Sequence, residues 1–332
     1  MKKTLLTGDR PTGPLHLGHY VGSLKNRVLL QAQYDTYIMI ADMQALTDHA
    51  DKPDWIKKNV LEVVKDYLSV GIDPTCAKIF IQSQIPQLAE LTMIFLNLVS
   101  VARLERNPTT KAEIQQKGYQ DSVPAGFLCY PVSQAADIAL FQASCVPVGD
   151  DQMPIIEVTN EIIRRFNHYY GSGCFIECEA ITSSTSRLMG IDGQAKASKS
   201  LGNAIFLSDS AEVVKNKVMQ MYTDPTHLKV SDPGNVEGNM VFHYLDAFHA
   251  NKDEVADLKA HYQRGGLGDV TIKKILIETL NTLLSPIRER RAALTDQICL
   301  EILQSGTEKA QHTALQMMKN VHALMGISYF KS

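Results

Sequence analysis

The chain has little of what marks secreted or membrane proteins. Its six cysteines are scattered without the regular spacing of a disulfide framework, which suits a reducing compartment. No apolar run is long enough to cross a bilayer, and the Met-Lys-Lys start leads directly into an apolar strand, without the core of a signal peptide. We therefore expect a cytoplasmic protein that does not contact a membrane.

Support for a metal centre is also weak. Cys174 and Cys178 have three residues between them, but no second pair of cysteines or histidines follows nearby. Ordinary buried or surface thiols are the favoured interpretation, so we expect no metal-ligating residues.

The sequence has no excess of positive charge. The net charge is −3, and neither the first 205 residues nor the remainder is basic. Proteins that bind nucleic acid normally carry a positive footprint, so any such contact here would have to use local patches. The candidates, each of which could instead belong to a solvated helix face, are Arg103, Arg106, Lys111, Lys117, Arg164, Arg165, Arg288, Arg290 and Arg291.

What the sequence does contain is an alternation of strand and helix patterns. Apolar runs of strand length occur at 3–6, 36–41, 78–82 and 145–148. A polar loop is expected after the second run, from Asp42, and then a helix at 53–70. This order predicts a doubly wound, parallel (Rossmann-type) α/β sheet with its ligand at the carboxyl ends of the strands. Mainly helical structure, including an α-helical C-terminal domain, is predicted for 88–143, 208–221, 240–250, 253–264, 271–293 and 307–325.

The stretch 7–20, T-G-D-R-P-T-G-P-L-H-L-G-H-Y, lies between the first strand and a helix. Its glycines and prolines break regular structure, so His16 and His19 are expected where the helix begins. Backbone N–H groups and the positive end of a helix dipole favour bound phosphate there, and Gly18 leaves bare backbone for a base or ribose. The stretch predicts a nucleotide-binding turn. The alternative is a histidine pair that caps the helix or lies in the core.

A second motif, A-K-A-S-K-S, occupies 195–200 in a segment rich in glycine and serine. It has neither a strand nor a helix period, so we expect a mobile loop, and taken alone such a loop is usually a solvated linker. Together with the H-x-G-H turn, it resembles the HIGH and KMSKS signatures of class I aminoacyl-tRNA synthetases. In that class the two motifs hold the triphosphate of ATP from opposite sides.

Within that class the chain resembles bacterial tryptophanyl-tRNA synthetases over essentially its whole length. The matching stretches are 8–13 (G-D-R-P-T-G), 130–137 (Y-P-V-S-Q-A-A-D), 146–152 (V-P-V-G-D-D-Q) and 157–167. The resemblance implies that tryptophan and ATP, with Mg²⁺ as the companion of ATP, form an adenylate, and that the tryptophanyl group then passes to tRNA(Trp). It also implies a homodimer. Since the C-terminal region contains only Cys299, we expect no iron–sulfur cluster.

The resemblance implies a domain division and a set of site residues. Residues 1–205 would form the catalytic domain, with a helical dimerisation insertion at about 85–143, and 206–332 would form the domain that binds the tRNA anticodon. The catalytic residues would be His16, His19, Lys196 and Lys199. The ATP-binding residues would be Arg10, Thr12, Gly18, His19, Lys111, Gly149, Asp151, Gln152, Lys196, Ser198, Lys199 and Ser200. The amino-acid pocket would contain Leu6, Gln44, Tyr130, Gln134, Asp137, Val146 and Val148.

The chain departs from the family pattern at four of these positions or beside them. Ala197 replaces the usual methionine of the lysine loop, which removes an apolar contact that would hold the loop closed. Leu6 stands where many members have phenylalanine, and Gln44 and Gln134 stand where many have histidine and methionine.

The choice between tryptophan and tyrosine depends on few residues, because tyrosyl-tRNA synthetases share the fold and both ATP motifs. Tyr130, Gln134 and Asp137 are spaced to lie on one helix face, with Pro131 in its first turn, and this pattern alone suits either substrate. Tyrosine enzymes place a phenol-binding tyrosine on the first strand, whereas Leu6 offers only apolar contact, which favours an indole. The remaining alternatives are a nucleotidyltransferase and a synthetase-like regulatory protein that binds amino acid and nucleotide.

Overall fold

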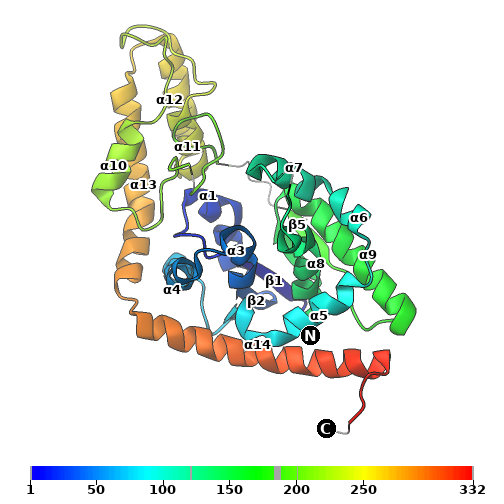
Figure 1. Ribbon diagram of the computed structural model, residues 1–332. Helices are drawn as coiled ribbons and strands as arrows, with labels where there is room; N and C mark the ends of the chain where they lie inside the picture. Colours follow the sequence, from blue (N-terminus) through cyan, green and yellow to red (C-terminus); the bar gives the residue numbers. More distant parts are fainter. Residues whose placement is uncertain (1, 120–121, 183–187, 200, 331–332) are drawn as a thin grey trace.

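A parallel sheet of five strands forms the centre of the protein (Figure 1). The computed structural model describes residues 2–119, 122–182, 188–199 and 201–330. The strands are β1 (Thr4–Asp9), β2 (Asp35–Ile40), β3 (Ala77–Ile81), β4 (Cys145–Val148) and β5 (Glu179–Thr182), in the order β3-β2-β1-β4-β5. The predicted doubly wound Rossmann-type sheet is thereby confirmed.

The strand order creates a switch point between β1 and β4. The chain moves outward from β1 to β3 and then crosses back to place β4 on the other side of β1. Helices that leave neighbouring strands toward opposite faces open a crevice at the carboxyl ends of those strands, where ligands of such sheets bind. The sequence patterns did not reveal β5, which is short and only partly buried.

The first strand is longer than predicted. It continues through Thr7 and Gly8 to Asp9, so Gly8 does not break the strand. A Cβ at Gly8 would lie 2.3 Å from the carbonyl oxygen of Met39 on β2. Glycine at this position therefore allows close strand packing beneath the turn.

Helices cover both faces of the sheet. They are α1 (Leu17–His19), α2 (Lys25–Leu30), α3 (Asp42–His49), α4 (Pro53–Val70), α5 (Pro86–Leu96), α6 (Val101–Glu105), α7 (Pro108–Lys117), α8 (Ala125–Leu140), α9 (Met153–Tyr170), α10 (Ala211–Met219), α11 (Met240–Phe248), α12 (Lys252–Arg264), α13 (Asp269–Ala292) and α14 (Asp296–Met325). A π-helical turn, Tyr20–Leu24, joins α1 to α2, and 3₁₀ turns occupy Gln82–Gln84 and Asp150–Gln152.

Three helices differ from the sequence predictions. The loop expected from Asp42 is helix α3, whose few apolar residues hide its helical period. Helix α8 begins at Ala125, so Pro131 lies inside the helix rather than in its first turn. Helix α14 begins at Asp296, where the Thr295 side chain accepts a hydrogen bond from the Ile298 backbone N–H and caps it.

Alternation along β2 sends side chains to two hydrophobic cores. Ile38 and Ile40 join the core that includes α4, α11 and α13, whereas Tyr37 and Met39 join the core formed by α5, α8, α9 and the later part of α14. A strand that is apolar on both faces matches a parallel sheet between two helical layers.

The last helix packs against the edge of the sheet rather than with the other C-terminal helices. A Cβ at Gly306 of α14 would lie 2.0 Å from the Ile79 carbonyl oxygen on β3, and Thr307 accepts a bond from the Ile81 N–H at 3.4 Å. Figure 1 shows α14 running along the sheet while α10 to α13 group beside it. The edge of β3 is thus covered, and the division at residue 205 stays a prediction. Within the described ranges no helix has the length and apolar character needed to span a membrane.

Candidate functional site

A cavity of about 1350 Å³ opens at the carboxyl ends of β1, β2, β4 and β5. Its walls include nearly all of the residues that the sequence patterns single out, drawn from segments almost 200 positions apart. These are Leu6, Arg10, Thr12, His16, Gly18, His19, Gln44, Tyr130, Gln134, Asp137, Val146, Val148, Gly149, Asp151, Gln152, Lys196, Ser198 and Lys199.

Among the predicted site residues that the structure describes, Lys111 is not brought into this cavity. Lys111 is exposed on α7 and does not line it, whereas Lys117 and Glu113 of the same helix do. Its predicted phosphate contact therefore lacks support, because the face of α7 turned to the cavity belongs to residues further along the helix. Ser200 lies outside the described residues.

The two histidines cap the helix and also line the cavity. His16 is the N-cap of α1: its Nδ1 accepts the Gly18 N–H at 3.1 Å, and His19 Nδ1 accepts the His16 N–H at 3.3 Å. Each ring therefore carries its proton on Nε2. Burial lowers the pKa of His16 to about 2 and the pKa of His19 to about 4, so both rings are neutral hydrogen-bond donors near pH 7.

The histidine turn is joined to the segment that follows the lysine loop. The Leu17 N–H donates to the Ile205 carbonyl at 2.9 Å, and the Leu207 N–H donates to the Leu15 carbonyl at 3.0 Å, on either side of an antiparallel bridge between His16 and Phe206. These backbone bonds fix the two motifs next to each other.

The lysine loop itself reaches the turn through a side chain. Lys199 Nζ donates to the carbonyl oxygen of Gly13 at 2.7 Å, and Ala197 lies close to Gly18. Burial lowers the pKa of Lys199 to about 8, while the carboxylates of Asp9 and Asp66 act in the opposite direction. The ammonium therefore remains mostly charged near pH 7 in a partly dehydrated position.

A polar group at the bottom of the cavity surrounds Asp137, which is 1% exposed. Its carboxylate accepts from Gln44 Nε2 at 3.1 Å and from Gln82 Nε2 at 3.0 Å, and the Gln44 backbone N–H donates to Gln82 Oε1 at 3.1 Å. Leu6, 3% exposed, supplies an apolar wall of the same cavity. Sequence reasoning missed Gln82, although its position directly after β3, at the carboxyl edge of the sheet, is a usable signal.

A second acidic centre lies at the rim. Asp48 on α3 accepts from Arg10 Nη1 at 2.7 Å and from Lys117 Nζ at 2.8 Å, and its side chain is only 4% exposed. It ties the segment after β1 to helix α7 across the cavity mouth. Asp48 was not predicted, because α3 was expected to be a loop.

The last three arginines proposed as a patch for nucleic acid are used inside the protein. Arg290 Nε donates to the Ser69 carbonyl at 2.6 Å, Arg288 Nη1 donates to the Asp209 carbonyl at 3.1 Å, and Arg291 pairs with Glu62. These contacts anchor the end of α13 to α4 and to the start of the C-terminal helices. Arg290 is nevertheless exposed, so a role of this group in binding nucleic acid stays a prediction.

A turn after β4 completes the far wall. A Cβ at Gly149 would lie 2.8 Å from Asp151 Oδ1, so glycine here leaves room for that carboxylate as the structure places it. Thr109 donates its hydroxyl to the Asp151 carbonyl and ties the turn to α7. The walls of the cavity therefore include neutral hydrogen-bond donors, ammonium groups, a buried carboxyl group and apolar side chains.

A parallel sheet with an H-x-G-H turn joined to a lysine loop defines a class I aminoacyl-tRNA synthetase, and the chain belongs to that family. Residues 2–285 match the family model described as tRNA synthetases class I (W and Y).

Individual relatives show which members of that family the chain is similar to. The chain is 58% identical to a tryptophan–tRNA ligase of Streptococcus mutans and 56% identical to one of Streptococcus agalactiae, in each case over 99% of both chains. A tryptophanyl-tRNA synthetase from Campylobacter jejuni complexed with ADP and tryptophan shares its structure, with a TM-score of 0.86 and 31% identity over 97% of this chain and 99% of that one.

Replacing Asp137 by asparagine tests how the fold holds this buried carboxyl. Burial raises its pKa from 3.8 to about 7, so the folded protein keeps a proton that the unfolded chain releases. The protonated Asp137 therefore contributes to the free energy of unfolding. This contribution is fully present below about pH 4 and is lost as pH rises through 7, by at most about 4 kcal/mol. The amide of Asp137→Asn does not titrate. In urea unfolding, the free energy of unfolding of this variant minus that of the parent should therefore be larger at pH 8 than at pH 5.

The matched control is Asp73→Asn. Asp73 is exposed, and the hydrogen bonds from Thr75 lower its pKa, so the carboxylate is charged at both pH values and the change should have the same effect at each. An equal difference at both pH values for Asp137→Asn as well would show that Asp137 titrates like an exposed carboxyl.

Proposed function

We propose that the protein is a tryptophan–tRNA ligase, which joins the tryptophan carboxylate to the α-phosphate of ATP, releases pyrophosphate and transfers the tryptophanyl group to tRNA(Trp). The observation that carries the proposal is that one cavity has Asp137, the apolar Leu6 and the joined histidine and lysine motifs in its walls. The named relatives at 56 to 58% identity support the same conclusion.

Activation of tryptophan needs two anions held within attack distance and stabilisation of the charge that develops on the leaving pyrophosphate. We assign the neutral Nε2–H groups of His16 and His19 to the phosphates, since donors without charge can bind them without repelling Mg²⁺. Lys196 and Lys199 would stabilise the leaving pyrophosphate, with Lys199 exchanging the Gly13 carbonyl for phosphate oxygen. Mg²⁺ would arrive as the companion of ATP. Among the described residues no cluster of three His, Cys, Asp or Glu side chains is placed to hold a metal.

Selection of tryptophan would rest on Asp137 and Leu6. The carboxylate can accept the indole N–H while Gln44 and Gln82 keep it oriented. Leu6 provides no hydrogen-bond partner for a phenol, so the hydroxyl of a bound tyrosine would lack a partner on that side.

Amino-acid-dependent exchange of pyrophosphate into ATP tests this function. Tryptophan should support exchange at a kcat/KM at least about 10³-fold above that for tyrosine, because a site built around one buried hydrogen bond rejects an analogue that cannot complete it. Exchange with tyrosine at an equal or higher rate would refute the assignment, and absence of exchange with all twenty amino acids would favour a regulatory protein.

Removing the Lys199 ammonium should slow catalysis selectively. Because that charge meets the pyrophosphate only as it leaves, Lys199→Ala should lower kcat by about 100-fold or more with little change in the KM for tryptophan. Lys215→Ala, at an ion-paired lysine 55% exposed on α10, is the control and should keep parental kinetics. A raised KM with an unchanged kcat would contradict the role given to Lys199.

A homodimer is the proposed assembly, formed through the helices of the 85–143 insertion. Met93 on α5 and Val101 on α6 are 64% and 60% exposed, which suits a covered surface in a dimer. Sedimentation should give twice the chain mass of 36.8 kDa, and Val101→Asp should shift the protein toward monomer. Leu228→Asp, at a side chain 84% exposed outside the insertion, should leave the dimer intact. A monomeric parent would refute the proposal.

A further inference from the structure

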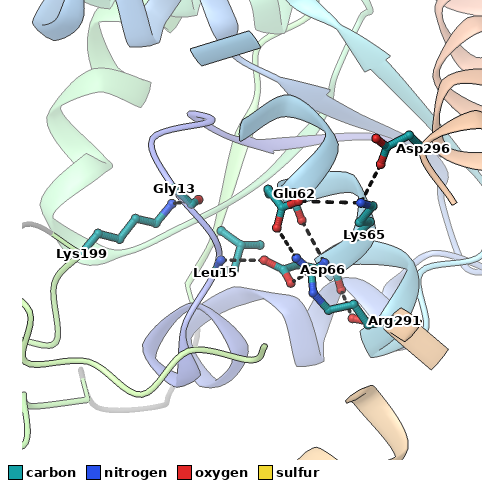
Figure 2. Close-up of polar contacts among 9 residues, drawn as sticks. Gly13, Leu15, Glu62, Lys65, Asp66, Lys199, Arg291 and Asp296 are labelled. Atoms are coloured by element: carbon teal, nitrogen blue, oxygen red, sulfur yellow. Dashed lines mark hydrogen bonds and ion pairs between the residues drawn. The ribbon is translucent and has the colours of Figure 1, made fainter. Parts of the chain in front are cut away.

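A buried carboxylate lies directly behind the histidine turn. Asp66 on α4 is 0% exposed, and its Oδ2 accepts the backbone N–H of Leu15 at 2.7 Å. Figure 2 shows this bond between helix α4 and the loop that carries Gly13. Leu15 immediately precedes His16, so the carboxylate sets the position of the backbone from which the first histidine projects.

The contact completes the support of the turn. The Leu15 carbonyl is held by the Leu207 N–H, and the Gly13 carbonyl is held by Lys199, both from the lysine-loop side. Asp66 holds the Leu15 N–H from the opposite side, through a helix that is packed into the core. The turn is therefore held by the backbone bond to Leu207 and by the side chains of Lys199 and Asp66.

The second oxygen of Asp66 faces a cation from the C-terminal helices. Arg291 Nη1 on α13 lies 3.3 Å from Asp66 Oδ1, and the same guanidinium pairs with Glu62 one turn earlier on α4. Lys65, next to Asp66 in sequence, pairs with Asp296 of α14 at 2.6 Å and with Glu62 at 3.7 Å, and it makes no direct contact with the turn (Figure 2).

A carboxylate in this position is costly for the fold. Asp66 lies beside the core residues Val63, Val64 and Tyr67, and burial raises its pKa to about 6, while the Arg291 guanidinium and the bond from Leu15 lower it. An isolated buried charge destabilises a protein unless it is paired. Oδ2 of Asp66 accepts a hydrogen bond from the turn, whereas Oδ1 has no hydrogen-bond partner and only the ion-pair contact with Arg291 of the C-terminal region.

We infer that Asp66 is a positioning residue for amino-acid activation: it fixes the Leu15 backbone and hence His16, and Arg291 supplies the counter-charge that holds Asp66 in place. This inference rests on the proposed function. Asp66 does not touch the reacting groups and acts only through the turn.

Kinetics of variants at the two residues test the inference. Tryptophan-dependent exchange is measured per active site, counted from the burst of adenylate. Asp66→Ala should lower kcat about 30-fold with the KM for tryptophan within two-fold, since a shift of the turn by less than 1 Å misplaces the phosphates. Asp66→Asn should stay within about five-fold of the parent, because its amide oxygen still accepts the Leu15 N–H. Lys65→Gln, which breaks an ion pair of the same helix, is the matched control and should be unchanged.

Arg291→Gln provides a readout that depends on charge. The groups that face the Asp66 carboxyl are Arg291, Glu62, Lys199 and the Leu15 N–H. Loss of Arg291 raises the pKa of Asp66 further, so the carboxyl holds a proton near pH 7 and ionises again as pH rises. The kcat of Arg291→Gln should be about five-fold below the parent at pH 7 and should approach it at pH 8.5, whereas the deficit of Asp66→Ala should persist at both.

Three results would overturn the inference. They are an unchanged kcat per active site in Asp66→Ala, an equal loss in Lys65→Gln, or, if Asp66→Ala does not fold, parental kcat in Arg291→Gln at pH 7. Each leaves the proposed function intact, because the parent remains active in the same assay. A parent without exchange activity would refute the proposed function and the inference with it.

Discussion

The site depends on the backbone bonds that join the histidine turn to the segment after the lysine loop. Leu15 and Leu17 exchange hydrogen bonds with Leu207 and Ile205, so two parts of the chain about 190 residues apart are fixed side by side at the end of β1. Without this junction, the histidines and lysines would lie on separate loops. Because of this junction, the fold brings neutral donors and ammonium groups to one cavity before any ligand binds. This lowers the entropic cost of positioning the reactants.

Burial gives the titratable groups of the cavity properties that they lack in water. The two histidines are neutral donors, and the pKa of Lys199 falls to about 8 while that of Asp137 rises to about 7. A dehydrated site strengthens each remaining charge interaction, so a few groups are enough to bind anionic phosphates. The polar side chains around Asp137 satisfy its oxygens, as a buried carboxyl requires.

The C-terminal helices make direct contacts with the sheet and with the helices that cover it. Helix α14 covers the edge of β3, and arginines near the end of α13 bind α4, which in turn supports the turn at Leu15. Arginines of α13 that could have formed a basic patch make contacts within the protein.

The sequence alone determined the parallel sheet and most of the cavity, because both depend on local signals: apolar runs of strand length, a turn rich in glycine and proline, and short motifs that resemble a known family. It did not reveal Asp48 or Asp66, since no local pattern in the sequence identifies the partners of these carboxyl groups. It also missed Gln82, although the position of this residue directly after β3 is a signal. It also misassigned α3 and the place of Pro131 in α8. Only the tertiary structure decided these, because their roles arise from contacts between elements far apart in the chain, whose energies depend on burial and on which groups meet.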